Sequence, residues 1–306
     1  MNRFEYLEAQ TLPEAIALLG QHEGTRIVAG ATDFLVRWRQ GVWKPPSVLS
    51  IQRISGLDEV SYDPTSGLSL GTLVTIRQIE LHPLIRAHYP ALSQAASTFA
   101  GVQIRNLATV GGNICNASPA GDTLPALLAY EAECRLNGPE GERRVPLESF
   151  LLGPGRTVLR PAELLVELRL PPLPPHSSAL YIKHSPRSSM DISAVGVASV
   201  ITMEGGNDAC REAHIAMGAV GPTVLRARSA EALLRGQRPD AALIQQAARA
   251  AMEEARPIDD IRGTARHRRA IVEALAGRTL RSAIQMAQGT DFPFQTQRAL
   301  AVEAMF

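Results

Sequence analysis

The stretch at residues 109–130 constrains the fold of this chain more than any other. It reads TVGGNICNASPAGDTLPALLAY, with two adjacent glycines, a turn of small residues, and an apolar helical run that begins after Asp122. A Gly-Gly step lets the backbone approach a ligand closely and can point successive N–H groups at one anion. Asp122 could cap the following helix or accept a hydrogen bond from a sugar hydroxyl. Taken alone, such a pattern is more often a plain glycine turn between two elements.

A second small-residue loop lies about 80 residues upstream. Residues 25–29 (TRIVA) indicate a short strand, which is followed by Gly30, Ala31, Thr32 and Asp33 before FLVRWRQ resumes helical spacing. A loop that opens a helix directs free N–H groups and the positive end of the helix dipole at one spot, which suits a phosphate. Asp33 could equally be a simple helix cap. Two such loops could grip both sides of one pyrophosphate, which favours a nucleotide as the ligand.

Composition and charge exclude several classes of function. The chain has 306 residues, 45% hydrophobic and 20% charged, enough to bury a sizeable core over two or three domains. Its 31 basic and 30 acidic residues leave a net charge of +1, with no electrostatic footprint for nucleic acid or a membrane surface. We see neither a signal peptide at residues 1–20 nor a stretch approaching the roughly 18 apolar residues of a membrane span. We therefore expect a cytoplasmic protein.

The residue types that usually carry metals or covalent catalysis are sparse and scattered. Cys115, Cys134 and Cys210 are widely spaced, and no two of the seven histidines have helical metal-ligand spacing. The chain also has no G-x-S-x-G elbow, Walker loop or H-E-x-x-H motif. The sequence therefore predicts no metal centre and no catalytic residue in this chain.

The residues before position 171 predict an α+β arrangement. Two capping boxes, Thr11 to Glu14 and Thr75 to Gln78, each indicate the start of a helix. The first helix is expected to stop at Gly20, and strands at 25–29 and 48–51 then form a βαβ-like unit of about 50 residues. Further elements are expected as a strand at 68–70, a small-residue helix at 90–100, and strands at 133–136, 143–145 and 163–170.

A proline-rich break separates this half from the rest of the chain. Residues 171–175 read PPLPP and can continue neither a sheet nor a helix. The segment PIDDIRGTARHRR at 257–269 is interpreted as a solvated loop with ion pairs. We therefore predict domains at 1–175, with parts of about 1–55 and 56–175, and at 176–290, followed by a tail at 291–306. The second domain is expected to hold strands at 180–183, 192–203 and 211–219 and then helices at 229–234, 240–254 and 267–286.

The two loops together resemble a known family. IVAGATDF at 27–34 with TVGGNICNASPAGD at 109–122 is similar to the FAD-binding medium subunit of the molybdenum hydroxylases, a group that includes xanthine dehydrogenase, carbon monoxide dehydrogenase and 4-hydroxybenzoyl-CoA reductase. The resemblance covers nearly the whole chain, because the C-terminal strands and helices and the segment at 257–269 are also similar to that family. It implies an α+β fold with a two-part FAD-binding domain of the vanillyl-alcohol-oxidase (PCMH) type at 1–175. A C-terminal domain with a three-stranded sheet and helices would lean on the extended FAD.

The same resemblance implies roles for individual residues. Residues 27–34 would form the first pyrophosphate loop, residues 109–113 would form the second, and Asp122 would hold a ribose or ribityl hydroxyl. Ala31 stands where much of the family has a second glycine, and we expect it to be tolerated if its φ angle is negative. The implied FAD-binding residues are Ile27, Val28, Ala29, Gly30, Ala31, Thr32, Asp33, Phe34, Phe99, Thr109, Val110, Gly111, Gly112, Asn113, Asp122, Leu165, Lys183 and Asp191.

The roles of four residues, Phe99, Leu165, Lys183 and Asp191, each come from a single matched position. Phe99 matches an aromatic residue that packs against the adenine end of FAD, and Leu165 matches an apolar backbone contact. Lys183 matches a basic residue near the flavin ring. Asp191 has an acidic counterpart in xanthine dehydrogenase but is displaced by one residue, which leaves its role open.

The resemblance also implies an electron-transfer role within a larger complex. In the family, an organic substrate reacts at the molybdenum cofactor of a large subunit, and electrons pass singly through two 2Fe-2S clusters of a small subunit. The FAD in this chain would then pass electrons to an acceptor such as NAD, a quinone or oxygen, and the resemblance implies a dimer of heterotrimers. In 4-hydroxybenzoyl-CoA reductase the flavin subunit carries an inserted cluster, and no such insertion separates Asn113 from Thr123.

Two other functions stay open from the sequence. One is a self-sufficient FAD-dependent reductase of the enolpyruvyl-sugar-nucleotide type, which would need its own substrate pocket and proton donor. The other is a structural bridging subunit that has lost its flavin, against which the intact Gly30, Gly111, Gly112 and Asp122 argue.

Overall fold

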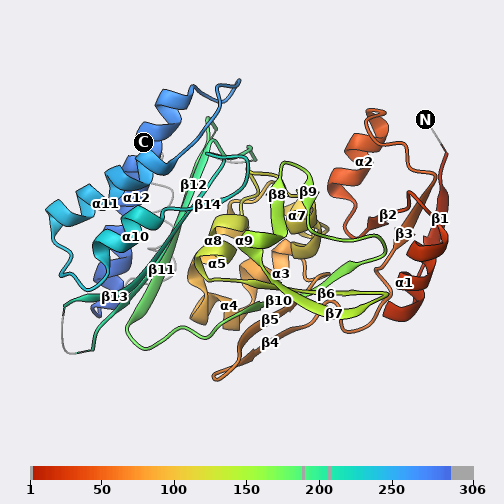
Figure 1. Cartoon of the computed structure of the whole chain (residues 1–306), viewed down its shortest axis with the longest axis horizontal. Helices are drawn as coiled ribbons and strands as arrows, with labels where there is room; N and C mark the ends of the chain where they lie inside the picture. Colours follow the sequence, from red (N-terminus) through yellow and green to blue (C-terminus); the bar gives the residue numbers. More distant parts are fainter. Residues whose placement is uncertain (1–2, 188–189, 206–207, 291–306) are drawn as a thin grey trace.

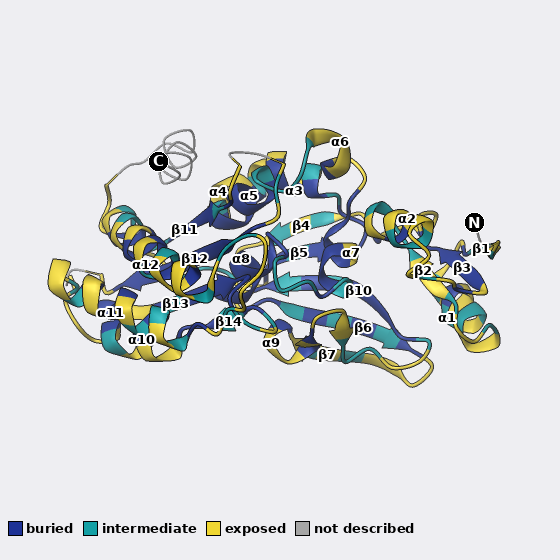
Figure 2. Ribbon diagram, turned by 90° about the horizontal axis from the view of Figure 1, so that it is seen from above, coloured by how far each residue is buried: buried dark blue, intermediate teal, exposed yellow. Residues whose placement is uncertain are grey.

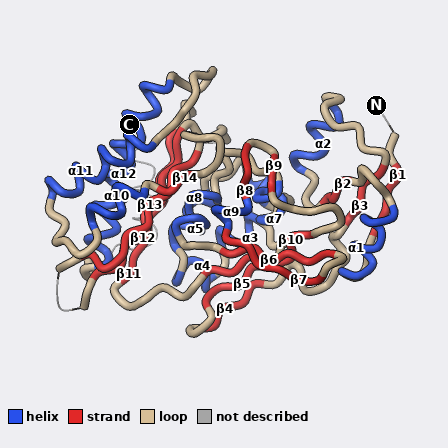
Figure 3. Tube along the Cα trace, in the orientation of Figure 1, coloured by secondary structure: helices blue, strands red, loops and turns tan. Residues whose placement is uncertain are grey.

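Three of the four β-sheets that the structure describes have three or more strands, and these three follow one another along the molecule, each with its own helices (Figure 1). The computed structural model describes residues 3–187, 190–205 and 208–290. The N-terminal unit contains a three-stranded parallel sheet, the middle unit a five-stranded antiparallel sheet, and the C-terminal unit a four-stranded antiparallel sheet (Figure 3). The mixture of sheets and helices confirms the predicted α+β class.

The N-terminal unit consists of β1 (Glu5–Glu8), α1 (Leu12–Gln21), β2 (Arg26–Val28), α2 (Thr32–Arg39) and β3 (Ser47–Ser50). Both β1 and β2 pair in parallel with β3, which is why helical connections are needed between the strands. Thr11 caps α1 by accepting a hydrogen bond from the Glu14 N–H, as predicted. The Glu14 carboxylate accepts from the N–H of Gln10 and so holds the turn before the helix. A small core joins this unit to Leu164 and Val166 of the middle unit.

The middle unit consists of β4 (Val60–Asp63), β5 (Gly67–Gly71), α3 (Ile76–Leu81), α4 (Pro83–His88), α5 (Pro90–Ser97), α6 (Val102–Arg105), α7 (Val110–Cys115), α8 (Leu124–Ala129), β6 (Glu133–Gly138), β7 (Gly141–Pro146), α9 (Leu147–Phe150), β8 (Leu151–Gly153), β9 (Arg156–Thr157) and β10 (Leu164–Leu170). Its main sheet has the strand order β4-β5-β10-β6-β7. Leu68 and Leu70 of β5 are buried while Ser69 between them is half-buried, because alternate side chains of a strand face opposite sides. The buried side of the sheet faces the helices of this unit.

The C-terminal unit consists of β11 (Ser177–His184), β12 (Val195–Met203), β13 (Cys210–Gly218), β14 (Leu225–Arg226), α10 (Arg228–Leu234), α11 (Ala241–Glu254) and α12 (Ala265–Ala287). The three predicted strands form an antiparallel meander, and the two-residue β14 adds a fourth. All three predicted helices are present and carry an exposed outer surface (Figure 2).

Both faces of this third sheet are buried. Val197 and Ile201 of β12 pack in one core with the three C-terminal helices, and Ala198 and Val200 pack in another core with the helices of the middle unit. Every residue of β12 is therefore buried. A strand buried on both faces carries apolar or small residues on both of them, and β12 lies within the predicted strand at 192–203.

The predicted break lies between β10 and β11. Residues 171–176 form neither a helix nor a strand, and the Tyr89 hydroxyl donates a 2.9 Å hydrogen bond to the Pro171 carbonyl. The predicted tail at 291–306 lies outside the described residues. Among the described residues, no helix is long and apolar enough to cross a bilayer.

Several short elements are not predicted by the sequence pattern. The strand β1 has the sequence EYLE, and two of its four residues are exposed, so it lacks a clear hydrophobic alternation. The helix α7 contains the Gly-Gly pair that we interpreted as part of a loop. Glycine is a poor helix former, but here Thr109 caps the helix by accepting a hydrogen bond from the Gly112 N–H.

A buried hydroxyl at the start of α5 allows a direct test of the middle core. The Tyr130 hydroxyl accepts a 3.1 Å hydrogen bond from the Ala91 N–H, which has no partner within its own helix. We expect Tyr130→Phe to lower the free energy of unfolding by about 1–3 kcal/mol, because the amide is left buried and unpaired. The measurement is urea unfolding of the apo protein. Tyr62→Phe, which alters a partly buried tyrosine of the same cluster, should cost less than about 0.5 kcal/mol. Equal losses in the two variants would contradict this account.

Candidate functional site

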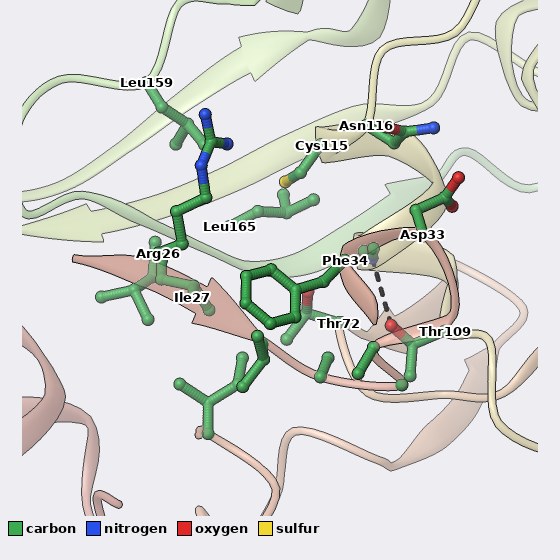
Figure 4. A pocket seen from close by; sticks show the side chains of 18 of the residues that line it. Arg26, Ile27, Asp33, Phe34, Thr72, Thr109, Cys115, Asn116, Leu159 and Leu165 are labelled. Carbon is green, nitrogen blue, oxygen red and sulfur yellow. Dashed lines mark hydrogen bonds between the residues drawn. The ribbon is translucent and has the colours of Figure 1, made fainter. Parts of the chain in front are cut away.

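Two neighbouring hollows of the molecule share part of their lining. The first hollow, about 520 Å³, is lined by both small-residue loops and by Leu165 (Figure 4). The second, about 650 Å³, is lined by Asp122 and Asp191 together with Arg187 and Arg262. The two hollows share the residues Thr32, Asp33, Phe99, Asn113 and Asn116. We refer to the two neighbouring hollows together as the cleft, which has room for an extended ligand.

The first loop presents a row of free backbone donors. The N–H of Leu35 closes the first turn of α2 on the Ala31 carbonyl. Within the described chain, the N–H groups from Gly30 to Phe34 donate to no protein acceptor. They lie at the positive end of an eight-residue helix, which is the environment that binds phosphate groups in many proteins.

The structure settles two points that the sequence left open for this loop. Ala31 has a φ angle of +57° and is itself the N-cap of α2, so a left-handed conformation is held by a residue with a Cβ. Asp33 does not cap the helix, because it lies inside the first turn and the N-cap has no side-chain hydrogen bond. At Gly30 there is no room for a side chain, since a Cβ there would lie 1.8 Å from the Leu107 carbonyl oxygen. The loop is therefore pressed against the middle unit at Gly30.

The second loop does not present its N–H groups to the cleft. The N–H of Val110 donates to the Val74 carbonyl at 2.9 Å, and that of Gly111 donates to the Thr72 carbonyl at 3.0 Å. The expectation of successive free donors at the Gly-Gly step is therefore wrong, since the Gly112 N–H is occupied by the Thr109 hydroxyl. Gly111 is required for packing, because a Cβ would lie 1.7 Å from the Thr72 hydroxyl oxygen. Gly112 is exposed and leaves the wall of the cleft free of side chains.

A buried ion pair lies at the second hollow. The ammonium group of Lys183 donates to the Asp122 carboxylate at 2.9 Å, to the Thr98 carbonyl at 3.1 Å and to the Asp191 carbonyl at 2.9 Å. Asp122 does not cap the following helix, because the N-cap of α8 is Thr123. The other carboxylate oxygen of Asp122, Oδ1, is buried and accepts no hydrogen bond from the described residues. Burial raises the pKa of Asp122 from 3.8 to about 6, although Lys183 acts in the opposite direction.

Phe99 and Asp191 lie close to this ion pair. Phe99 directly follows Thr98, the residue whose carbonyl Lys183 contacts, and Arg105 donates a hydrogen bond to the Phe99 carbonyl. Phe99 is therefore close in the chain to a contact of Lys183, and it lines both hollows. The carboxylate of Asp191 accepts from the Ile192 N–H at 2.8 Å and faces its own loop.

The remaining predicted positions divide into cleft and core. Val110 is fully buried and lines neither hollow, whereas Leu165 and the residues from Ile27 to Phe34 all line the first one. The sequence did not single out Asn116, which borders both hollows and has a buried side-chain oxygen that accepts no hydrogen bond from the residues described. An asparagine three residues after Asn113 gives no local signal of this role.

Comparison with known proteins decides the family. Residues 2–173 match the FAD binding domain in molybdopterin dehydrogenase, and residues 180–283 match the CO dehydrogenase flavoprotein C-terminal domain. The chain belongs to this flavoprotein family. The predicted family, and with it the class of oxidoreductase subunit, is thereby confirmed.

Similar proteins span almost the entire flavoprotein. The putative xanthine dehydrogenase FAD-binding subunit XdhB of Escherichia coli K12 is 30% identical over 93% of this chain and 97% of its own length. The carbon monoxide dehydrogenase medium chain of Hydrogenophaga pseudoflava is 31% identical over 92% of this chain and 97% of its own. A solved carbon monoxide dehydrogenase from the same organism, which lacks the Mo-pyranopterin moiety of its molybdenum cofactor, superposes with a TM-score of 0.88 at 32% identity, covering 92% and 97% of the two chains.

The site of the flavoprotein fits FAD on three structural observations. The free N–H groups at α2 suit a pyrophosphate, and the exposed Gly112 leaves room for a ligand to approach the backbone closely. The unpartnered Asp122 Oδ1 is an acceptor that a ligand hydroxyl would satisfy. These features occur along one cleft rather than at separate places.

Substitution at Gly112 tests the close approach of the ligand. We expect Gly112→Val to fold but to bind FAD at least about tenfold more weakly, because the branched side chain would fill the wall of the cleft. Gly20→Val, at an exposed helical glycine with open space around it, should bind FAD normally. The measurement is FAD titration of both apo variants. Normal FAD affinity in Gly112→Val would remove this part of the site.

The buried carboxyl of Asp122 makes the stability of the apo flavoprotein pH-dependent. Between about pH 4 and pH 6 the native Asp122 keeps a proton that the unfolded chain has already released. By linkage, this group lowers the free energy of unfolding as the pH rises through that window, by up to about 3 kcal/mol. We expect Asp122→Asn to remove this decrease, as measured by urea unfolding from pH 4.5 to 7.5. The exposed Asp58→Asn serves as control, and an unchanged pH profile in Asp122→Asn would disprove the assignment.

Proposed function

We propose that this flavoprotein holds FAD along the cleft and transfers electrons between iron–sulfur clusters of a partner subunit and an external acceptor. The observation that carries the proposal is the arrangement of free N–H groups at α2 and an unpartnered acid oxygen at Asp122, in the cleft. This spacing suits a dinucleotide, with its pyrophosphate near the middle and a sugar hydroxyl at the acid.

The orientation of FAD follows from the same groups. The pyrophosphate would accept hydrogen bonds from the N–H groups between Gly30 and Phe34, next to the wall that both hollows share. Asp122 would accept a hydrogen bond from a ribityl hydroxyl, and the flavin ring would lie in the second hollow near Phe99 and Asp191. Lys183 would act by fixing the walls of that hollow, because its three donors are already used by protein oxygens.

The residues of the cleft support electron transfer rather than catalysis on an organic substrate. When bound, FAD supplies the capacity to exchange electrons both singly and in pairs. Lys183 and Asp122 neutralise one another, and the thiol of Cys115 is held protonated because burial raises its pKa to about 12. Among the residues that the structure describes, no group of His, Cys, Asp and Glu could hold a metal ion. The chain thus binds and orients the flavin and leaves substrate chemistry to its partners.

The names of similar proteins support a proposal about partner subunits. Relatives are named as a medium chain and as FAD-binding subunits, which are names for parts of larger enzymes. We therefore propose a small iron–sulfur subunit and a large molybdopterin subunit, assembled as a dimer of heterotrimers. The domain division near residue 176 remains part of this proposal.

Anaerobic mixing tests the electron route. We expect an organic substrate of the complex to reduce the flavin only when the iron–sulfur subunit is present, because the electrons must arrive through its clusters. Flavin absorbance is followed after mixing substrate with complexes that contain or lack that subunit.

The same experiment separates the alternatives. Rapid flavin reduction in the isolated chain by an organic substrate would identify a self-sufficient reductase. A purified chain that binds no FAD would identify a structural bridging subunit, and either result would overturn the proposal.

A further inference from the structure

The end of the first hollow that lies away from Asp122 has its own lining. Arg26, Ile27 and Trp43 of the N-terminal unit form one side, and Leu159 and Pro161 of the middle unit form another. None of these five residues lines the second hollow. If the pyrophosphate binds at α2 and the flavin lies beside Asp122, this end receives the adenosine half of FAD.

Two arginines contact one indole at this end. The guanidinium carbon of Arg26 lies 4.0 Å from the ring centroid of Trp43, and that of Arg37 lies 4.7 Å from it. Within the described residues, neither arginine forms an ion pair with a carboxylate. Burial and the neighbouring Arg37 lower the pKa of Arg26, as expected for two cations without a nearby anion. Only Arg26 of the two lines the hollow, where it extends from β2 into the cavity (Figure 4).

The backbone fixes this arrangement to the phosphate-binding helix. The N–H groups of Val42 and Trp43 both donate to the Arg37 carbonyl, at 2.9 Å and 3.3 Å, at the end of α2. At the start of the same helix, the ring of Phe34 lies 6.1 Å from that of Trp43. These contacts fix the distance between the Trp43 ring and a ligand bound at the N-terminus of α2.

We propose that Arg26, whose guanidinium lies over the Trp43 ring, stacks on the adenine ring of FAD and makes the site selective for FAD over FMN. This inference rests on the proposed function, because it assigns a contact to the adenosine half of the same FAD. A guanidinium plane and a nucleobase stack favourably, and the indole limits the conformations of the arginine before the base arrives. FMN lacks the adenosine half and would gain nothing from this contact.

The test is titration of the apo flavoprotein with FAD and with FMN. We expect Arg26→Ala to weaken FAD binding by about tenfold to a hundredfold, the usual range for one base stack, and to leave FMN affinity unchanged. Trp43→Leu should produce the same loss for FAD alone. Arg37→Ala is the matched control, because Arg37 contacts the same indole without lining the hollow. It should leave the affinity for both ligands within about twofold.

Each other outcome counts against a defined part of the inference. Equal losses for FAD and FMN would place Arg26 on the shared phosphate or in the fold, and full rescue by Arg26→Lys would show that charge rather than stacking matters. Unchanged FAD affinity in Arg26→Ala would overturn the adenine contact alone. If the wild-type chain bound neither FAD nor FMN, the proposed function itself would fail.

Discussion

The buried contact between Lys183 and Asp122 is the interaction on which the second half of the cleft depends. Burying two charges costs several kcal/mol, and the cost is offset only when the remaining hydrogen-bonding capacity is used. Lys183 meets this condition by contacting Thr98 after α5, Asp122 before α8, and Asp191 between β11 and β12. Three segments that are distant in sequence are thereby held at one point. The free oxygen of Asp122 is positioned by its partner rather than by its own loop.

The two small-residue loops contribute in different physical ways. The loop at Gly30 provides donors, since the first turn of α2 leaves its N–H groups without acceptors. The loop at Gly111 contributes a stretch of cleft wall without side chains. Its own N–H groups are paired within the protein. Four residues with positive φ angles, Ala31, Ala100, Ala162 and Met190, line the cleft. Strained backbone conformations commonly gather at functional sites.

The sequence predicted the regular elements well where one run of apolar residues extends over many positions. The strand at 192–203 and the helices at 240–254 and 267–286 are such cases, and each is present with its ends shifted by a few residues. The strand β1 could not be predicted, because four residues with two exposed glutamates carry no clear pattern. The site was harder, because partners there are set by tertiary structure. Asp122 pairs with Lys183, 61 residues away, and nothing in the local sequence separates this role from a helix cap.

The burial of the third sheet on both faces has a consequence for how a cofactor enters. Because β12 contributes Ala198 and Val200 to the core that it shares with the middle unit, pulling the C-terminal unit away would expose the apolar side chains on that face of the sheet. Such a separation would cost about 25 cal/mol for each Å² of apolar surface uncovered. Opening the cleft to FAD by a hinge motion that separates the C-terminal unit from the middle unit is therefore costly.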